Sequence, residues 1–345
     1  MGPMLDALAA GNFDGLARLF QDAGLRADLP GPGMLRVDAG VPGAMRLLIS
    51  VGVHGNETGP IEMMAQVLAS LAQEPAALAV DLLIVVGNPA AIAQARRFID
   101  ADLNRLFGRD RGSLGSLGAT AEAARADLIM RASTDFLAAD PGQGSVTKWH
   151  LDLHTAIRPS LYPRFAIIPA DASAPAQAAL GAWLGSAGID ALVFNGEAAP
   201  TYSAFTAHVL GAISSTVELG RIARLGENAL APLAHTQAAV ERLLRGQAEP
   251  IGADLPPRFR VAQEIIKRSD AFAMTIGPDT HNFTELAPGA LIATDGPLRL
   301  HVGELPELVI FPNPDVLVGQ RAGLMLVRLA SDGVEAADHP LRPDL

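Results

Sequence analysis

The chain has 345 residues, of which 49% are hydrophobic, and a formal net charge of −11. This length exceeds what one compact core usually holds, so we expect one large domain and a smaller one. The absence of cysteine excludes disulfides, thiolate metal ligands and a cysteine nucleophile. The negative charge argues against nucleic acid or an anionic membrane as partners. Neither a signal peptide nor an uninterrupted apolar span is visible, so we expect a cytoplasmic protein.

Predicted strands and helices alternate over the first two thirds of the chain. Residues 1–40 indicate a helical start and then a lead-in rich in glycine and proline. Buried strands are expected at 46–53, 80–86, 149–153, 165–168, 192–194 and 213–219, and helices from Pro60 and at 119–138, 174–188 and 228–246. Strands that are apolar on both faces and alternate with helices are typical of a parallel sheet covered on both sides. For residues 1–251 we therefore predict an α/β catalytic domain with a mostly parallel mixed sheet and helices on both faces.

The pattern changes at about Gly252. Short strands separated by turns rich in glycine and proline are expected at 259–266, 291–293, 298–302, 308–311 and 324–329. Such strands predict a small all-β domain, a barrel or a sandwich, over residues 252–345.

A histidine and a glutamate follow the first buried strand. His54 and Glu57 lie three residues apart on a turn that Gly55 and Gly59 allow to bend sharply. An imidazole and a carboxylate placed in this way can hold one metal ion, and Zn²⁺ accepts such a mixed set of ligands. A hydrolytic zinc site also needs a third protein ligand and an open position for water.

The segment 149–156 offers the third ligand. His150, Asp152 and His154 occupy alternate positions and therefore face the same side of a predicted strand. The spacing allows either histidine to be the ligand, although His154 is nearer the end of the strand. Asp152 can accept a hydrogen bond from a ligating imidazole and fix its tautomer. The alternative is a structural His/Asp pair that binds no metal.

Glu218 ends a further predicted strand. A carboxylate there is costly unless it is solvated, paired or functional. As a catalytic group it would take a proton from zinc-bound water and pass it to a leaving amine, and the alternative is an exposed glutamate. Since His54, His154 and Glu218 all fall at the carboxyl ends of predicted strands, where open α/β sheets bind ligands, we expect them to converge in one crevice.

Several arginines follow the second buried strand, namely Arg96, Arg97, Arg105, Arg109 and Arg111. Arg97 and Arg105 can clamp carboxylates with paired hydrogen bonds, with Asp100 and Asp102 bracing them. Arg158, just after the strand of His154, is another candidate for binding an anion. A solvated charged loop is the alternative for the arginine cluster.

Five segments carry a combined signature: His54-Gly55-Asn56-Glu57-Thr58, Gly87-Asn88-Pro89, residues 97–107 (RFIDADLNRLF), Asp152-Leu153-His154-Thr155 and Val217-Glu218-Leu219-Gly220. Together they resemble the succinylglutamate desuccinylase/aspartoacylase family, which has a zinc carboxypeptidase-like fold. The resemblance extends from about residue 40 to residue 330. Residues 149–158 and 311–326 resemble the desuccinylase branch.

The resemblance implies roles for individual residues. Glu218 would activate water, Arg97 would polarise the scissile carbonyl, and Asn104 and Arg105 would hold a substrate carboxylate. The implied ligands of a single Zn²⁺ are His54, Glu57 and His154. Relatives often carry an arginine shortly before the catalytic glutamate, where this chain has residues 207–209 (AHV), which leaves open how the distal substrate carboxylate is held.

The implied reaction splits N-succinyl-L-glutamate into succinate and L-glutamate, the last step of an arginine-degradation route. A small acidic substrate with three carboxylates would explain several arginines in an acidic chain. The alternatives are hydrolysis of another N-acyl acidic amino acid, as in aspartoacylase, and a non-catalytic metal-binding protein of the same fold. A carboxypeptidase is disfavoured because the chain has only two tyrosines. A homodimer is compatible with the sequence.

Overall fold

The computed structural model describes residues 2–108, 118–138, 146–169, 174–196, 199–247, 255–277 and 279–330. The helices are α1 (Pro3–Ala9), α2 (Asp14–Asp22), α3 (Gly59–Leu71), α4 (Pro89–Ala93), α5 (Ala121–Leu137), α6 (Ala174–Ser186), α7 (Tyr202–Leu210) and α8 (Ala234–Leu244). The strands are β1 (Arg26–Asp28), β2 (Met34–Asp38), β3 (Arg46–Val51), β4 (Asp81–Val86), β5 (Lys148–Ala156), β6 (Arg164–Pro169), β7 (Ala191–Asn195), β8 (Ile213–Arg221), β9 (Arg258–Ile266), β10 (Phe272–Met274), β11 (Thr284–Leu286), β12 (Leu291–Asp295), β13 (Leu298–His301), β14 (Glu307–Ile310) and β15 (Arg321–Arg328).

One sheet runs through the described part of the chain. Its twelve strands lie in the order β1-β2-β4-β3-β5-β8-β6-β7-β9-β15-β14-β11. The central strands β4, β3, β5 and β8 are parallel to one another, whereas β2 and β6 are antiparallel to their neighbours β4 and β8. The predicted mixed α/β sheet is confirmed.

Helices cover both faces of the central part of this sheet. Along β3, Leu47 and Ile49 join a core formed with α1, α2, α3, α6 and α8. Leu48 points the other way and joins a core formed with α5 and α7. Because neighbouring residues of a strand face opposite sides, a strand between two helical layers is buried on both faces, and all six residues of β3, including the polar Arg46 and Ser50, are buried.

The sequence did not indicate β1, β2 or α7 as separate elements. The lead-in before residue 40 in fact adds β2 to the sheet, antiparallel to β4, and β1 beyond it at the edge. These strands are short, and exposed or half-buried residues alternate with buried ones in each. Their pattern is therefore weaker than that of the buried central strands.

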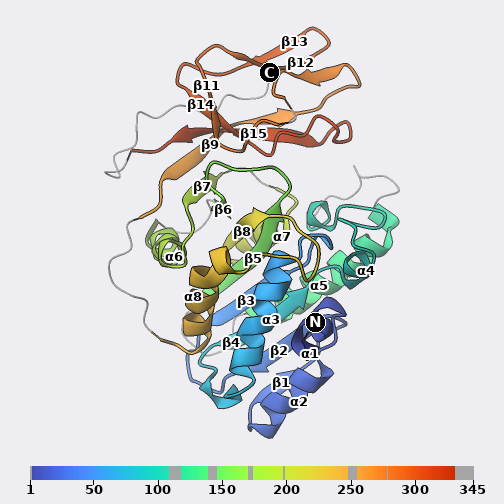
Figure 1. Cartoon of the computed structure of the whole chain (residues 1–345), viewed down its shortest axis with the longest axis vertical. Helices are drawn as coiled ribbons and strands as arrows, with labels where there is room; N and C mark the ends of the chain where they lie inside the picture. The colour runs from blue at the N-terminus through green and yellow to red at the C-terminus, as the bar shows by residue number, and fades with distance from the viewer. Residues whose placement is uncertain are drawn as a thin grey trace.

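The C-terminal strands lie at one end of the molecule and α2 at the other (Figure 1). A second sheet of the described residues, β10-β12-β13, packs in this C-terminal region. The large sheet does not stop at the expected domain boundary, because β9 pairs in parallel with β7. The boundary itself, between residues 251 and 252, lies outside the described residues and stays a prediction.

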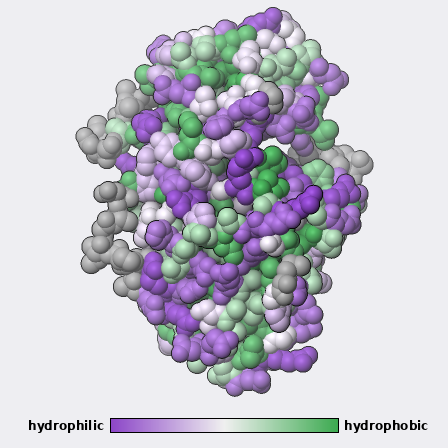
Figure 2. Space-filling model, in the orientation of Figure 1, coloured by the Kyte–Doolittle hydropathy of each residue, from purple (hydrophilic) through white to green (hydrophobic). Residues whose placement is uncertain are grey.

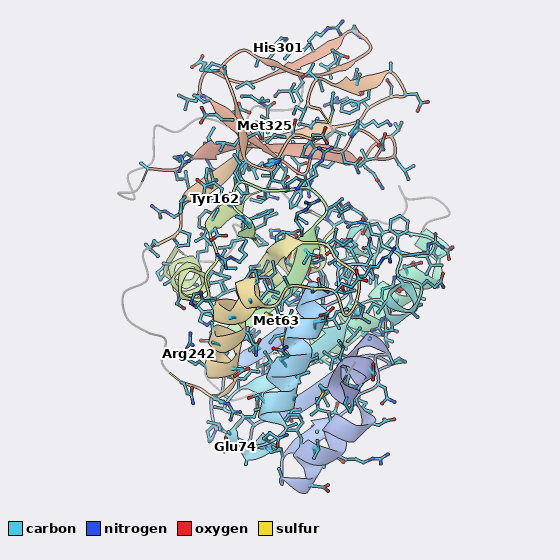
Figure 3. The ribbon with its side chains drawn as sticks, viewed as in Figure 1. Met63, Glu74, Tyr162, Arg242, His301 and Met325 are labelled. Atoms are coloured by element: carbon cyan, nitrogen blue, oxygen red, sulfur yellow. The ribbon has the colours of Figure 1, made fainter. Side chains whose placement is uncertain are left out.

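An aromatic cluster reinforces this junction. Phe165 from β6 and Phe259 from β9 pack with Phe283 in one buried apolar cluster that also contains residues of β14 and β15. The ring of Tyr162, labelled in Figure 3, lies 4.9 Å from that of Phe283 between centroids. The C-terminal strands are thus joined to the rest by both backbone pairing and side-chain packing.

The surface carries many charged and polar groups. Hydrophilic side chains are spread over the face shown in Figure 2, with smaller hydrophobic areas between them. Among the helices that the structure describes, none has the length and apolar character needed to cross a membrane.

Gly55 brings the turn after β3 against the helix after β4. A Cβ at Gly55 would lie 2.3 Å from the carbonyl carbon of Ala91 and 2.4 Å from the nitrogen of Ile92. Both are backbone atoms of α4, which cannot move aside cheaply. The turn that carries His54 and Glu57 therefore depends on a residue without a side chain.

We expect Gly55→Ala to lower the free energy of unfolding by about 1–3 kcal/mol, the usual range for overpacking. Gly15→Ala is the matched control, since this exposed glycine of α2 has no atom within 4 Å of an added Cβ. The control should change stability by less than about 1 kcal/mol. Urea unfolding followed by circular dichroism compares the two, and equal stabilities would contradict the packing described.

Candidate active site

Four side chains named from the sequence meet at the carboxyl ends of three strands. His54 and Glu57 follow β3, His154 lies towards the end of β5, and Glu218 lies towards the end of β8. Because β3, β5 and β8 are parallel neighbours, these ends lie together, and His154 is paired in register with Glu218. All four side chains are buried and line one cavity of about 700 Å³.

Glu57 lies between the two histidines. Its Oε1 is 2.8 Å from Nδ1 of His54, and its Oε2 is 2.8 Å from Nδ1 of His154. One potential ligand atom from each residue lies within 4.8 Å of the others. Nδ1 of His54 is buried and forms no hydrogen bond, although Oε1 of Glu57 lies close to it. A cation held jointly by the three groups would satisfy this nitrogen, so the residues fit a metal ion.

Carboxylates hold the outer nitrogens of both imidazoles. Nε2 of His154 lies 3.0 Å from Oδ2 of Asp152, and Nε2 of His54 lies 2.9 Å from Oδ1 of Asp102. Burial would raise the pKa of each of these carboxyls, but the neighbouring groups, of which the adjacent imidazole has the largest effect, together outweigh burial and lower the pKa. Such outer partners orient ligating histidines and make them more basic. The sequence suggested this role for Asp152 and assigned Asp102 only to bracing arginines.

The charges around His154 favour a positive charge in the site. Burial would lower the pKa of His154, but Asp152 and Glu57 outweigh burial and hold it well above its usual value. Burial would likewise raise the pKa of Glu57, and the two histidines hold it well below the usual range. A proton or a metal ion can supply that positive charge.

Glu218 is the carboxyl group beside this cluster. It is buried, and its Oε2 has no hydrogen-bond partner in the described part of the protein. Burial and then the Glu57 carboxylate raise the pKa of Glu218 to about 7. A carboxyl group with such a pKa can both accept and donate a proton near neutral pH.

Arg97 lies directly against the histidine and glutamate pair. It donates from Nη1 to Oε1 of Glu57 at 2.7 Å, and its Nη2 is 3.0 Å from Nε2 of His54. Its loop is held by the buried Glu122 of α5, which accepts from the backbone nitrogen of Ile99 at 2.7 Å. The sequence did not single out Glu122, because only the tertiary structure brings α5 to this loop.

Three further residues named from the sequence also line the cavity. Asn104 is buried, and its Oδ1 accepts from the backbone nitrogen of Tyr202 at 2.9 Å, which ties it to the start of α7. Arg105 donates from Nη1 to the carbonyl of Asn104 at 3.0 Å. Arg158 donates to the carbonyls of Gly277 and Thr280 in the C-terminal region. Arg109 and Arg111 of the predicted cluster lie outside the described residues.

His150, the rival ligand in the sequence, belongs to the core. Its Nε2 lies 2.8 Å from Oγ of Ser50, and its Nδ1 lies 2.7 Å from Oγ1 of Thr206. Burial lowers the pKa of His150 to about 4, so the ring is neutral. The structure does not bring it into the group that could hold a metal. His208, on α7, does not line the cavity.

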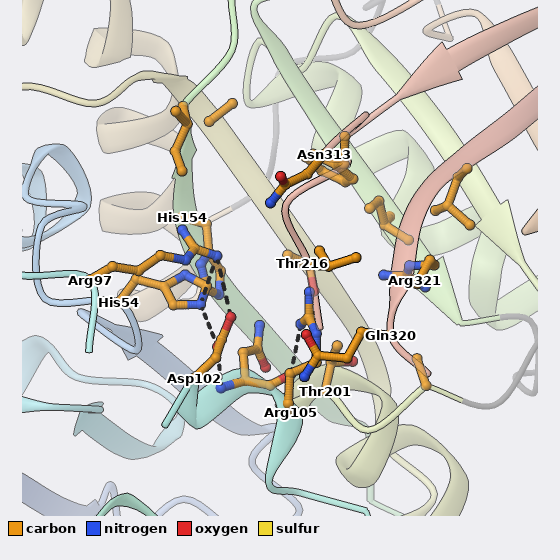
Figure 4. A pocket seen from close by; sticks show the side chains of 18 of the residues that line it. His54, Arg97, Asp102, Arg105, His154, Thr201, Thr216, Asn313, Gln320 and Arg321 are labelled. Atoms are coloured by element: carbon orange, nitrogen blue, oxygen red, sulfur yellow. Dashed lines mark hydrogen bonds and ion pairs between the residues drawn. The ribbon is translucent and has the colours of Figure 1, made fainter. Parts of the chain in front are cut away.

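The C-terminal region forms the opposite wall of the cavity. Asn313, Gln320 and Arg321 line it on the side that faces His54 and His154 (Figure 4). Sequence analysis did not name these residues as part of the site. The only signal was that residues 311–326 resemble the desuccinylase branch.

Comparison with known proteins gives consistent matches. Residues 44–244 match the succinylglutamate desuccinylase/aspartoacylase catalytic domain, and residues 256–329 match the AstE/AspA barrel-sandwich hybrid domain. A succinylglutamate desuccinylase from Burkholderia thailandensis is 39% identical over 286 residues, 83% of this chain and 80% of that protein. The crystal structure of succinylglutamate desuccinylase from Vibrio cholerae matches with a TM-score of 0.80 at 30% identity over 89% of both chains. That from Chromobacterium violaceum matches with a TM-score of 0.76 at 32% identity over 91% of this chain and 97% of that one.

The catalytic-domain match spans more than half of the sequence, and the relatives align over most of its length. This chain belongs to the succinylglutamate desuccinylase/aspartoacylase family.

Proposed function

We propose that this protein hydrolyses N-succinyl-L-glutamate to succinate and L-glutamate with one Zn²⁺ per chain. The observation that carries this proposal is the buried group of His54, Glu57 and His154 beside Glu218 in one cavity. The choice of substrate is supported by relatives named succinylglutamate desuccinylase, which are 39% and 40% identical over 83% and 84% of the chain.

His54, Glu57 and His154 would hold the ion, with Asp102 and Asp152 fixing the two imidazoles from outside. Two imidazole nitrogens and a carboxylate are a set of ligands found in catalytic zinc sites. Bound Zn²⁺ supplies a Lewis acid and lowers the pKa of a water molecule to about 7.

Glu218 moves the protons of the reaction. Its carboxylate takes a proton from the attacking water, and the resulting carboxylic acid gives that proton to the amine nitrogen of the departing glutamate. Its position beside His154 and its pKa of about 7 suit both steps. Arg97 donates to the carbonyl oxygen of the amide as negative charge develops there, since its guanidinium already lies against the group of potential ligands.

The arginines match the charge of the substrate. N-succinylglutamate carries three carboxylates, and Arg105 and Arg158 line the same cavity as Glu218. Guanidinium groups bind carboxylates through charge-assisted hydrogen bonds, so a trianionic substrate can enter an acidic protein. We assign Asn104 to the same subsite as Arg105, where its side chain also holds the start of α7.

The decisive experiment is hydrolysis of N-succinylglutamate against N-acetylaspartate, with and without a chelator. We expect hydrolysis of N-succinylglutamate that is lost with the chelator and restored by Zn²⁺. Preference for N-acetylaspartate would favour the aspartoacylase-like reaction, and activity that survives complete metal removal would contradict the metal mechanism.

His54→Ala and Glu218→Gln separate metal binding from proton transfer. His54→Ala removes a ligand and should lose both bound zinc and activity. Glu218→Gln leaves the ligands in place and should keep one zinc per chain while kcat falls about 10²–10⁴-fold. Elemental analysis and steady-state kinetics measure both, and a fully active Glu218→Gln protein would remove Glu218 from its role.

Arg97→Lys keeps the charge but loses the planar pair of donors. We expect full zinc content and a fall in kcat of about 10²-fold or more, as for the loss of a donor to the oxyanion. Arg96→Lys is the matched control, because the neighbouring Arg96 does not line the cavity. Equal kinetics for the two variants would show that Arg97 takes no part in the reaction.

A further inference from the structure

The proposed hydrolysis gives no role to the residues that the C-terminal region contributes to the cavity wall. Residues of the segment after β14 and of the first part of β15 line this wall, among them Asn313, Gln320 and Arg321. Among the described residues that line this wall, Arg321 is the positively charged one and Asp315 the negatively charged one. Figure 4 shows Arg321 directed into the cavity. It faces the region in which Arg105 lies.

Arg321 is held in place from behind. Its Nη1 donates to Oε1 of Glu264 on the neighbouring strand β9 at 3.0 Å. Glu264 does not line the cavity, whereas Arg321 does. This single ion pair fixes the direction of the guanidinium and leaves its other N–H groups available to a ligand. The Arg321 side chain retains 21% of its exposure, so a small molecule in the cavity can reach it.

Arg105, on the catalytic side, forms no salt bridge with a carboxylate of the described residues. Its side chain donates to one backbone carbonyl. Burial lowers the pKa of Arg105, and the positive charges of Arg321 and Arg97 lower it further, against the opposing effect of Asp102. Two guanidinium groups of like charge therefore act on the same part of the cavity, and an anion between them would relieve their repulsion.

We propose that Arg321, together with Arg105, holds a substrate carboxylate remote from the scissile amide, so that the C-terminal region determines which N-acyl amino acids are accepted. This inference rests on the proposed function. The carboxylate is either the free end of the succinyl group or the side chain of the glutamate, and both offer the same chemistry to two guanidinium groups. The distal carboxylate, for which the sequence offered no partner, thus finds one on β15.

The test compares Arg321→Ala with the unaltered protein on three substrates. These are N-succinylglutamate, N-succinylglutamine, in which the side-chain carboxylate is an amide, and N-succinamoylglutamate, in which the free succinyl carboxylate is an amide. For N-succinylglutamate we expect kcat/KM to fall about 10- to 100-fold, mostly through KM, as for loss of a charge-assisted hydrogen bond. For the analogue that lacks the bound carboxylate, the same substitution should change kcat/KM less than about threefold. That analogue identifies which carboxylate Arg321 holds.

Two further variants separate recognition from folding. Arg328, at the other end of β15, packs over Phe259 and does not line the cavity. Arg328→Ala should therefore leave the order of substrate preference unchanged. Arg321→Lys keeps the charge and should recover part of the lost kcat/KM. Thermal unfolding and zinc content show whether each variant is folded and loaded.

A loss of equal size on all three substrates would show that Arg321 holds neither of these two carboxylates, and unchanged kinetics would remove it from the site. Either result overturns this inference while the proposed function stands. An unaltered, zinc-loaded protein that hydrolyses none of the three substrates would overturn the proposed function and this inference with it.

Discussion

The carboxylate of Glu57, buried between two imidazoles, is the constraint on which the rest of the site depends. A buried charge is costly unless opposite charge and hydrogen bonds compensate it. Here His54 and His154 approach its two oxygens, and Arg97 donates to it as well. Each imidazole then needs a fixed orientation, which Asp102 and Asp152 provide from outside. The site is therefore a network of alternating charges whose three central groups could hold a metal ion.

The parallel sheet makes that network possible. Strands β3, β5 and β8 end side by side, so residues more than 150 positions apart in the chain, such as His54 and Glu218, meet without a long connecting loop. Apolar residues on both faces of β3 hold this strand between two helical layers. Gly55 then lets the turn after β3 lie against α4. Packing far from the cavity thus sets the positions of the ligands within it.

Much of this arrangement could be predicted from the sequence, because β3 and β4 carry apolar residues on both faces and the reactive residues lie towards or just after the ends of strands. The choice between His150 and His154 could not be predicted, since both side chains lie on the same side of the predicted strand. Their positions along the strand decide which one reaches the cavity, because four residues of strand separate the two histidines by about 13 Å. The contact between Asp102 and His54 depends on the path of a loop, and Arg321 reaches the cavity only because β9 continues the sheet beyond β7. Local patterns carry no information on such contacts.

The pairing of β7 with β9 also restrains the C-terminal wall of the cavity. Swinging the C-terminal region away from the cavity would break backbone hydrogen bonds between these strands and expose the aromatic rings packed beside them. Opening the cavity by moving its C-terminal wall would therefore cost free energy in both kinds of contact. Ile157 and Leu317, which line the same cavity, are apolar and exposed by 56% and 58%, and exposed side chains change rotamer far faster than whole domains move.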